Sequence, residues 1–293
     1  MAIHTIENDV LRVSVADEGA ELVSVLDKRS GEERIWQADP AVWNRHAPIL
    51  FPFVGKVADG KYRFNGREYP MKTQHGFARD KVFACAEAVE DCVCHELCDT
   101  PETLEIYPWP FRLRVKHSLD EAEPSRLRVT WEVENTGTET MLFAIGAHPG
   151  FLMPPGTAKE DCKIGFPGKE SLSYFSANPA GYALPEIVKE LPLTDSASPW
   201  LDNMPETWIF QNQGIDRVEI RRPDGEPYVA LDCPGFPLLA VWAKAEGPYI
   251  CLEPWYGRTD DAGFTGTLAE KPGEQSLAPG ETITYSYAMT FYA

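Results

Sequence analysis

The sequence predicts an all-β protein built as one large antiparallel β-sandwich. Three observations favour this fold class: apolar and polar residues alternate along several segments, short turn sequences join such segments, and proline or glycine interrupts each window where a helical pattern could develop. The chain contains 22 glycines and 25 prolines among its 293 residues. Because no repeat or shift in composition divides the chain, we expect a single domain over residues 1–293.

The alternating segments occur from one end of the chain to the other. Near the N-terminus, Leu11, Val13 and Val15 are separated by polar residues. Residues 127–133 place Leu, Val, Trp and Val at odd positions, with Arg, Thr and Glu between them. Residues 283–291 alternate in the same way up to the C-terminus. This period of two is typical of strands with one face in the core and the other in solvent.

Turns complete this picture. Asn65-Gly66 separates two short alternating segments and predicts a tight hairpin, since both residues tolerate a positive φ; Pro223-Asp224-Gly225 predicts a second hairpin. Helical structure is expected only as short turns, near residues 39–43 and 185–191. The loop-rich stretch 154–198 is expected on the surface or as a rim.

Composition excludes several classes of function. The net charge of −18 disfavours nucleic acid as a partner, because the phosphate backbone would be repelled over most of the surface. No apolar run of about 18 residues is present to span a membrane. The N-terminal residues lack the basic and apolar segments of a secretory signal, so we expect a cytoplasmic protein.

Seven cysteines are present, and we expect them to be reduced. Cys92, Cys94 and Cys98 lie close together beside His95. Their even spacing predicts one face of a strand, where closely spaced thiols rarely close a tetrahedron around a metal. We therefore expect buried or half-buried thiols there, without a metal and without an assigned role.

Three short sequences carry candidate chemistry. His75 opens His75-Gly76-Phe77-Ala78-Arg79, His148 precedes Pro149-Gly150, and Glu253 lies between Leu252 and Pro254-Trp255. The glycines leave the imidazoles accessible, and the apolar neighbours of Glu253 predict a raised carboxyl pKa. Two imidazoles and a carboxylate among aromatic residues can move protons on and off a sugar.

These sequences, taken in order, resemble the aldose 1-epimerase (galactose mutarotase-like) family, and are most similar to its bacterial branch. The resemblance covers nearly the whole chain and rests on five segments: Phe51-Pro52-Phe53-Val54-Gly55, Asp59-Gly60-Lys61-Tyr62, His75–Arg79, His148–Phe151 and Glu253–Gly257. It implies the β-supersandwich of that family, with the sugar held on a concave sheet. It also implies that the α and β anomers of a free hexose are interconverted by ring opening and closure.

The resemblance assigns roles to the three catalytic candidates. Glu253 is expected to act as the base on the C1 hydroxyl and His148 as the acid on the ring oxygen, with the roles reversed on closure. His75 is expected to hydrogen-bond the substrate near C1 and the ring oxygen. Arg79 is expected to form an internal ion pair with Asp80 or Glu253. This chemistry requires neither a metal nor a cofactor, and none is expected.

Substrate contacts are expected from four further residues. Lys56 and Glu206 occupy positions where relatives often carry an arginine and an aspartate that bind sugar hydroxyls. Both departures put the identity of the sugar in doubt, because a lysine lacks the planar fork of arginine and a glutamate reaches further than an aspartate. Trp242 is a candidate to stack on the apolar face of the sugar. Arg45 is a candidate contact with an equally plausible structural role.

Two other functions remain open at this point. The first is an epimerase of a hexose 6-phosphate, which needs several converging cations. The second is a non-catalytic carbohydrate-binding protein, which has no use for an acid and a base flanking one carbon. A polysaccharide lyase is disfavoured, because the acidic surface would repel long anionic chains. The expected partner is a small-molecule sugar, with neither nucleic acid nor membrane, and the protein is expected to be a monomer or a homodimer.

Overall fold

The computed structural model describes residues 2–199 and 207–293. Its largest sheet is antiparallel and has nine strands. Its strands are, in sheet order, β18 (Ala197–Pro199), β15 (Lys163–Gly165), β20 (Arg217–Arg221), β21 (Pro227–Asp232), β25 (Thr282–Phe291), β11 (Arg126–Asn135), β10 (Phe111–Leu119), β9 (Cys92–Cys98) and β8 (Ala84–Ala88). Buried and half-buried residues alternate without interruption along β11. One face of this sheet therefore packs into the core.

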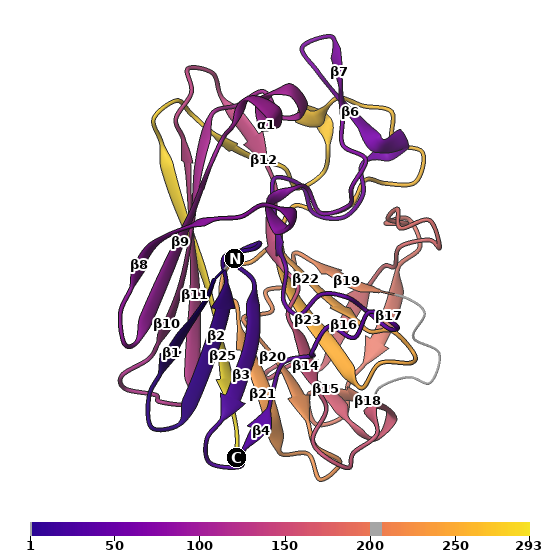
Figure 1. The fold of residues 1–293 in the computed structure, drawn as a ribbon. Helices are drawn as coiled ribbons and strands as arrows, with labels where there is room; N and C mark the ends of the chain where they lie inside the picture. Colours follow the sequence, from indigo (N-terminus) through magenta and orange to yellow (C-terminus); the bar gives the residue numbers. More distant parts are fainter. Residues whose placement is uncertain (1, 200–206) are drawn as a thin grey trace.

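A six-stranded antiparallel sheet carries the candidate catalytic carboxylate. It runs β19 (Trp208–Gln211), β22 (Leu238–Trp242), β23 (Tyr249–Tyr256), β13 (Ile145–Ala147) and β5 (Ile49–Leu50), and β14 (Gly150–Leu152) also pairs with β23. Figure 1 shows β8 to β11 on one side of the molecule and β19, β22 and β23 on the other. Strand β23 thus lies at the centre of its sheet, with β22 on one edge and β13 and β14 on the other.

Smaller sheets and turns complete the fold. The N-terminal sheet consists of β1 (Ile3–Glu7), β2 (Leu11–Ala16), β3 (Leu22–Asp27) and β4 (Glu32–Glu33). The two-stranded pairs are β6 (Lys61–Phe64) with β7 (Arg67–Pro70), β12 (Met141–Phe143) with β24 (Gln275–Leu277), and β16 (Ser171–Tyr174) with β17 (Lys189–Pro192). Helical structure in the described residues amounts to α1 (Pro101–Ile106) and 3₁₀ turns at Ala58–Gly60, Ala78–Asp80, Lys159–Asp161 and Leu268–Glu270. None of these helices is long and apolar enough to cross a membrane.

The core explains why one face of β23 points away from the protein interior. Ile250 and Leu252 belong to the same apolar cluster as Trp131 of β11, so this cluster joins the two large sheets. Alternate residues of a strand point to opposite faces. Glu253 and Trp255 therefore lie on the face of β23 that turns away from this cluster.

The all-β prediction is confirmed, and so are both hairpins. Strands β6 and β7 flank Asn65-Gly66, and β20 and β21 flank Pro223–Gly225. The backbone amides of Val42 and Trp43 both donate to the Asp39 carbonyl, which makes the expected single turn. The second expected turn is wrong in part, because residues 189–192 form β17 and pair with β16.

The cysteine prediction is confirmed for orientation and for the burial of Cys92 and Cys94, and is wrong for the burial of Cys98. On β9, the buried Val93, His95 and Leu97 face the core, so Cys92, Cys94 and Cys98 share the opposite face. Cys92 is buried and Cys94 half-buried, as expected, but Cys98 is exposed. The outer face of β9 is therefore open to solvent toward its C-terminal end.

Candidate active site

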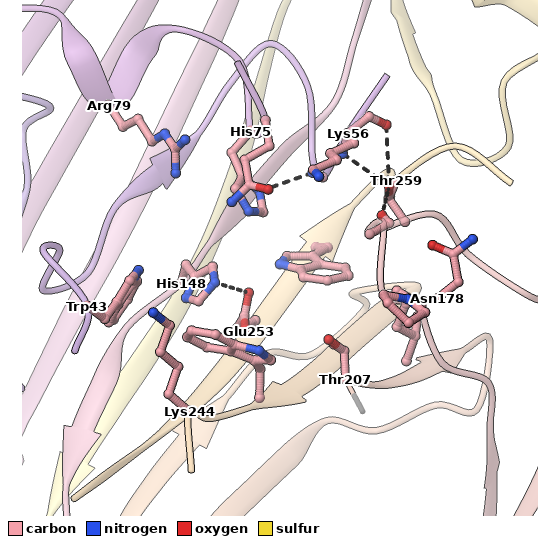
Figure 2. A pocket seen from close by; sticks show the side chains of 18 residues that line it. Trp43, Lys56, His75, Arg79, His148, Asn178, Thr207, Lys244, Glu253 and Thr259 are labelled. Carbon is pink, nitrogen blue, oxygen red and sulfur yellow. Dashed lines mark hydrogen bonds and ion pairs between the residues drawn. The ribbon is translucent and has the colours of Figure 1, made fainter. Parts of the chain in front are cut away.

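A pocket of about 440 Å³ lies on the outward face of the six-stranded sheet. This volume suits a small ligand. Strands β22 and β23 contribute Trp242, Glu253 and Trp255 to its lining, while loops contribute His75 and His148. Figure 2 shows these loops and strands converging from distant parts of the chain. The sequence-predicted acid, base and second histidine therefore line one pocket.

Glu253 is the one acidic residue among the described residues that line the pocket. Its side chain is 1% exposed and lies opposite Ala240 of β22. Burial raises the pKa of the Glu253 carboxyl well above its usual range, because the charged form loses its hydration. This direction agrees with the one predicted from its apolar neighbours in the sequence.

His148 follows directly after β13, which pairs with β23 and brings the imidazole to the carboxylate. The distance from His148 Nε2 to Glu253 Oε2 is 3.3 Å, a contact visible in Figure 2. Burial lowers the pKa of His148 to about 3, and the charge of Arg79 acts in the same direction. The ring packs against Trp43 at 4.9 Å and lies edge-on to Trp242 at 5.4 Å between centroids.

The His148–Glu253 pair holds one proton over a wide range of pH. Burial favours the neutral carboxylic acid and the neutral imidazole, so the pair gains a second proton only in strong acid. It loses its last proton only when the raised carboxyl pKa is passed. Between these limits one member of the pair can accept a proton while the other can donate one.

His75 adopts a left-handed backbone conformation that fixes its ring. Its φ is 67°, unusual for a residue with a side chain, and Gly76 follows at 68°. The Gly55 N–H donates to His75 Nδ1 over 3.0 Å, while the His75 N–H donates to the Gly55 carbonyl over 2.7 Å. Since Nδ1 accepts, the proton of the neutral ring lies on Nε2.

The electrostatics of His75 keep this ring neutral. Burial lowers its pKa well below the usual range, and the nearby His148 and Arg79 act in the same direction. The two imidazoles lie edge to face, with centroids 5.5 Å apart. His75 is therefore suited to donate an Nε2 hydrogen bond rather than to carry a charge.

Lys56 and Trp242, two of the predicted substrate contacts, both line the pocket. The Lys56 ammonium donates to the Ala180 carbonyl over 2.7 Å. Its backbone N–H donates to Thr259 Oγ1 over 3.0 Å, and the Thr259 hydroxyl donates to the Gly181 carbonyl over 2.7 Å. These bonds join the rim loop to the loop that carries Lys56 (Figure 2).

Arg45 does not reach the pocket. Its guanidinium donates to the Arg79 carbonyl over 3.1 Å and pairs with the Asp80 carboxylate, and it is not among the described residues that line the pocket. Of the two roles left open for Arg45, these contacts favour the structural one. Glu206, the remaining predicted contact, lies outside the described residues, next to the pocket-lining Thr207.

The ion pair expected for Arg79 does not form in the described residues. Asp80 pairs with Arg45 instead, and within the described chain Arg79 forms no ion pair. Its Nη2 lies 3.5 Å from Thr73 Oγ1, and its buried Nε lacks a hydrogen-bond partner in the described residues. Arg79 lines the pocket and presents a cation there. Arg79 and Asp80 are adjacent in the sequence, and nothing in the sequence predicts that Asp80 pairs with Arg45 from another loop.

Several pocket residues could not be found from the sequence. Trp43 lies in the predicted turn, but only the fold brings it to His148. Lys244 lines the pocket with its ammonium donating to the Val42 carbonyl over 2.6 Å. Asn178 lines the rim, and its side-chain oxygen accepts from the Ala180 and Tyr182 backbone amides. Such turn-forming asparagines are common in loops, so its type alone carries no signal.

A set of atoms that could ligate a metal lies at the pocket floor, where Cys251 packs behind the lining residues His148 and Glu253. A ring nitrogen of His148, Cys251 Sγ and a Glu253 oxygen lie within 4.8 Å of one another. Cys251 is fully buried and its thiol pKa is raised by that burial, so the thiolate that a metal requires is disfavoured. The acid–base use of His148 and Glu253 needs no such ion, and its absence remains a prediction.

Comparisons with known proteins agree with the geometry. A family model described as Aldose 1-epimerase matches residues 2–290. The chain is 32% identical to the plasmid-encoded protein LacX of Lactococcus lactis subsp. lactis, over 97% of this chain and 98% of that protein. A galactose mutarotase related enzyme from Lactobacillus acidophilus has a TM-score of 0.93 at 31% identity, covering 100% of this chain and 98% of that one. A galactose mutarotase-like protein from Lactobacillus casei has a TM-score of 0.91 at 29% identity, covering 99% and 100%.

Proposed function

The chain belongs to the aldose 1-epimerase family, and we propose that it interconverts the α and β anomers of a free hexose by acid–base ring opening and closure. The observation that carries this proposal is the buried His148–Glu253 contact of 3.3 Å on the pocket floor. A sugar-binding site alone gains nothing from two buried titratable groups of opposite proton preference, because each costs desolvation.

The reaction requires this pair to take one proton from the sugar and to give one proton to it in each step. Opening the ring removes the proton from the C1 hydroxyl, breaks the bond between C1 and the ring oxygen, and adds a proton to that oxygen. We assign Glu253 as the base and His148 as the acid, which requires the single proton of the pair to lie on the imidazole when the ring opens. The 3.3 Å contact allows this proton to pass from the carboxyl to the imidazole before that step. After rotation about the C1–C2 bond, Glu253 returns its proton to the C1 oxygen, His148 takes back the proton from the former ring oxygen, and the ring closes on the other carbonyl face. The pair ends each turnover with the proton count it started with.

His75 supports the same step without changing its charge. Its Nε2–H can donate to the C1 or ring oxygen, where negative charge develops as protons move. A fixed donor in a water-poor site stabilises such charge without having to reorganise. The bond from Gly55 to Nδ1 supplies that fixation.

The pocket floor supports binding of a pyranose. Trp242 and Trp255 line it beside Glu253, and Trp43 packs over His148. Indole rings bury the CH-rich face of a sugar without needing directional bonds. Hydroxyls remote from C1 would then form hydrogen bonds with polar groups on the rim, including Lys56, Asn178 and Thr259.

One observation favours a second substrate class, a hexose 6-phosphate. Three basic side chains, from Lys56, Arg79 and Lys244, line the pocket of a chain whose net charge is −18. Both ammonium groups already donate to backbone carbonyls, which leaves Arg79, with its unpartnered Nε, as the cation most available to an anion. A phosphate is held best by several charge-assisted bonds, so the free hexose remains the first choice.

Polarimetry on freshly dissolved α-glucose, α-galactose and their 6-phosphates tests the proposal. We expect the approach to equilibrium rotation to accelerate in proportion to enzyme, with the larger kcat/KM for a free hexose. The variant Arg79→Met separates the two classes, because it should lower kcat/KM for a 6-phosphate far more than for the free sugar if the phosphate is the true substrate. Sugar binding without any acceleration would show a carbohydrate-binding protein instead.

A further inference from the structure

A cluster of metal-ligating side chains that shares no residue with the described pocket lining lies where the N-terminal sheet meets the edge of the nine-stranded sheet. It comprises His4 of β1, Cys85 of β8 and His95 of β9, and one ligand atom from each lies within 4.8 Å of the other two. Cys85 and His95 are directly opposite in the β8–β9 register, so their side chains share a face. The cluster therefore draws ligands from three strands and two sheets.

His95 is the buried member of this cluster, with 0% of its surface exposed. Neither of its ring nitrogens has a hydrogen-bond partner among the described residues. Asp17 Oδ1 lies 3.4 Å from Nε2, outside hydrogen-bond geometry. A buried polar group without a partner costs about 1–3 kcal/mol, so its retention calls for an explanation. A ligand bound at the ring would provide one.

His4 is oriented as a metal ligand would be. Its Nδ1 lies 3.8 Å from Cys85 Sγ, and its Nε2 lies 2.9 Å from Asp17 Oδ1. A tetrahedral zinc ion with ordinary bond lengths separates a nitrogen and a sulfur ligand by about 3.6 Å. The second contact is the carboxylate bond by which metal-ligating histidines are commonly held.

We propose that His4, Cys85 and His95 bind one divalent transition-metal ion of the zinc class. Two imidazoles and a thiolate match the preference of Zn²⁺ and not that of Mg²⁺ or Ca²⁺, which take oxygen ligands. Asp17 orients His4 from behind. The fourth position is open to water, since Cys85 is exposed at the surface.

Such an ion would join two strands that are each at a sheet edge. Strand β1 ends the N-terminal sheet and β8 ends the nine-stranded sheet. Binding to the folded state alone stabilises that state by mass action. The site therefore has a readout in thermal stability as well as in metal affinity.

The test uses tag-free protein, because a histidine tag would itself bind metal. The protein is stripped with a chelator and titrated with Zn²⁺ in competition with a chromophoric chelator. A parallel titration with Co²⁺ monitors the thiolate-to-metal charge-transfer absorption. The variants are Cys85→Ser and, as the matched control, Cys98→Ser, which removes another exposed thiol from the same sheet. Glu253→Gln reports on the second candidate ligand set, in the pocket.

We expect one Zn²⁺ per chain in wild type, Cys98→Ser and Glu253→Gln, with a raised Tm and a thiolate band in the cobalt form. Cys85→Ser should lose the band and bind at least about tenfold more weakly, and Asp17→Asn should weaken binding by about 10–100-fold. Equal affinity in Cys85→Ser and wild type would overturn the proposal. So would a bound ion lost in Glu253→Gln and kept in Cys85→Ser, because that ion would lie in the pocket.

Discussion

Gly55 and His75 are joined by two reciprocal hydrogen bonds, one from the Gly55 N–H to His75 Nδ1 over 3.0 Å and one from the His75 N–H to the Gly55 carbonyl over 2.7 Å. Phe77 and Ala78 extend the contact, since both backbone amides donate to the Phe51 carbonyl over 3.0 Å. The loops at 51–56 and 75–80 therefore behave as one unit. That unit carries both the candidate hydrogen-bond donor and Lys56.

Replacing the proposed base should remove catalysis and leave binding intact. We expect Glu253→Gln to lower kcat by about 10²-fold or more with KM little changed, because the amide preserves shape and cannot accept the proton. Glu274→Gln is the matched control, because the Glu274 side chain is 3% exposed and Glu274 is not among the described residues that line the pocket. Steady-state polarimetry on both variants makes the comparison. Turnover near the wild-type value in Glu253→Gln would mean that the base is another group.

The pH dependence of activity should lack the usual histidine transition. The pKa of His148 is lowered to about 3 and that of Glu253 is raised, so the pair keeps its single proton between those limits. Activity should therefore stay flat through the ordinary histidine range near about 6.5 and fall only in stronger acid. At the other end, activity should fall as pH rises through the raised carboxyl pKa. Plots of kcat/KM against pH, corrected for spontaneous mutarotation, test this, and an acid limb near 6.5 would contradict it.

Lys56 should govern which sugar is preferred and not how protons move. Lys56→Arg substitutes a planar fork for an ammonium now held by the Ala180 carbonyl. One gained or lost bond to a hydroxyl is worth about 0.5–3 kcal/mol, which predicts changes of a few-fold to about a hundredfold in relative kcat/KM between glucose and galactose. The pH profile should not move. Lys61→Arg, an identical change on the exposed β6 hairpin, serves as the control.

Gly76 should resist substitution for a steric reason beyond its positive φ. A Cβ at this position would lie 2.2 Å from the Phe51 carbonyl oxygen. We expect Gly76→Ala to destabilise the fold by more than about 1–3 kcal/mol and to lower kcat by displacing His75. Gly168→Ala is the control, because its φ of 78° is similar and a Cβ there meets nothing within 4 Å. Denaturant unfolding compares the two, and equal losses would show that the Phe51 contact is unimportant.

Glu274 should make stability depend on pH. Burial raises its pKa to about 7 despite Lys271 at 3.5 Å, so the folded state binds its proton more tightly than the unfolded chain does. The resulting stabilisation is complete below the unfolded pKa of about 4.3 and is lost as pH rises through about 7, with a total on the order of 3 kcal/mol. Between about pH 4 and about pH 8, the free energy of unfolding of wild type should fall by about 3 kcal/mol more than that of Glu274→Gln. A difference independent of pH would refute it.

Sequence patterns predict the parts of this molecule that depend on local order. Strand β11 was predictable because one face meets the core and the other meets solvent, so apolar and polar residues alternate along its sequence. Strand β23 is buried on both faces and carries no such alternation, so Glu253 was found through its motif alone. Trp43 and Asn178 reach the pocket only through tertiary packing. The choice of Asp80 between Arg79 and Arg45 likewise depends on a loop from elsewhere in the chain.

The central place of β23 has a consequence for biosynthesis. His148 and its strand β13 leave the ribosome long before Glu253, and the strand that unites them pairs with β13, β14 and β22. Contacts between segments so far apart in the chain form late, because closing the long loop between them costs conformational entropy before the contacts can stabilise the chain. A nascent or truncated chain that ends before β23 carries both imidazoles and no carboxylate between them. Recovery of the proposed activity during refolding therefore requires β23 to have paired with β13 and β22.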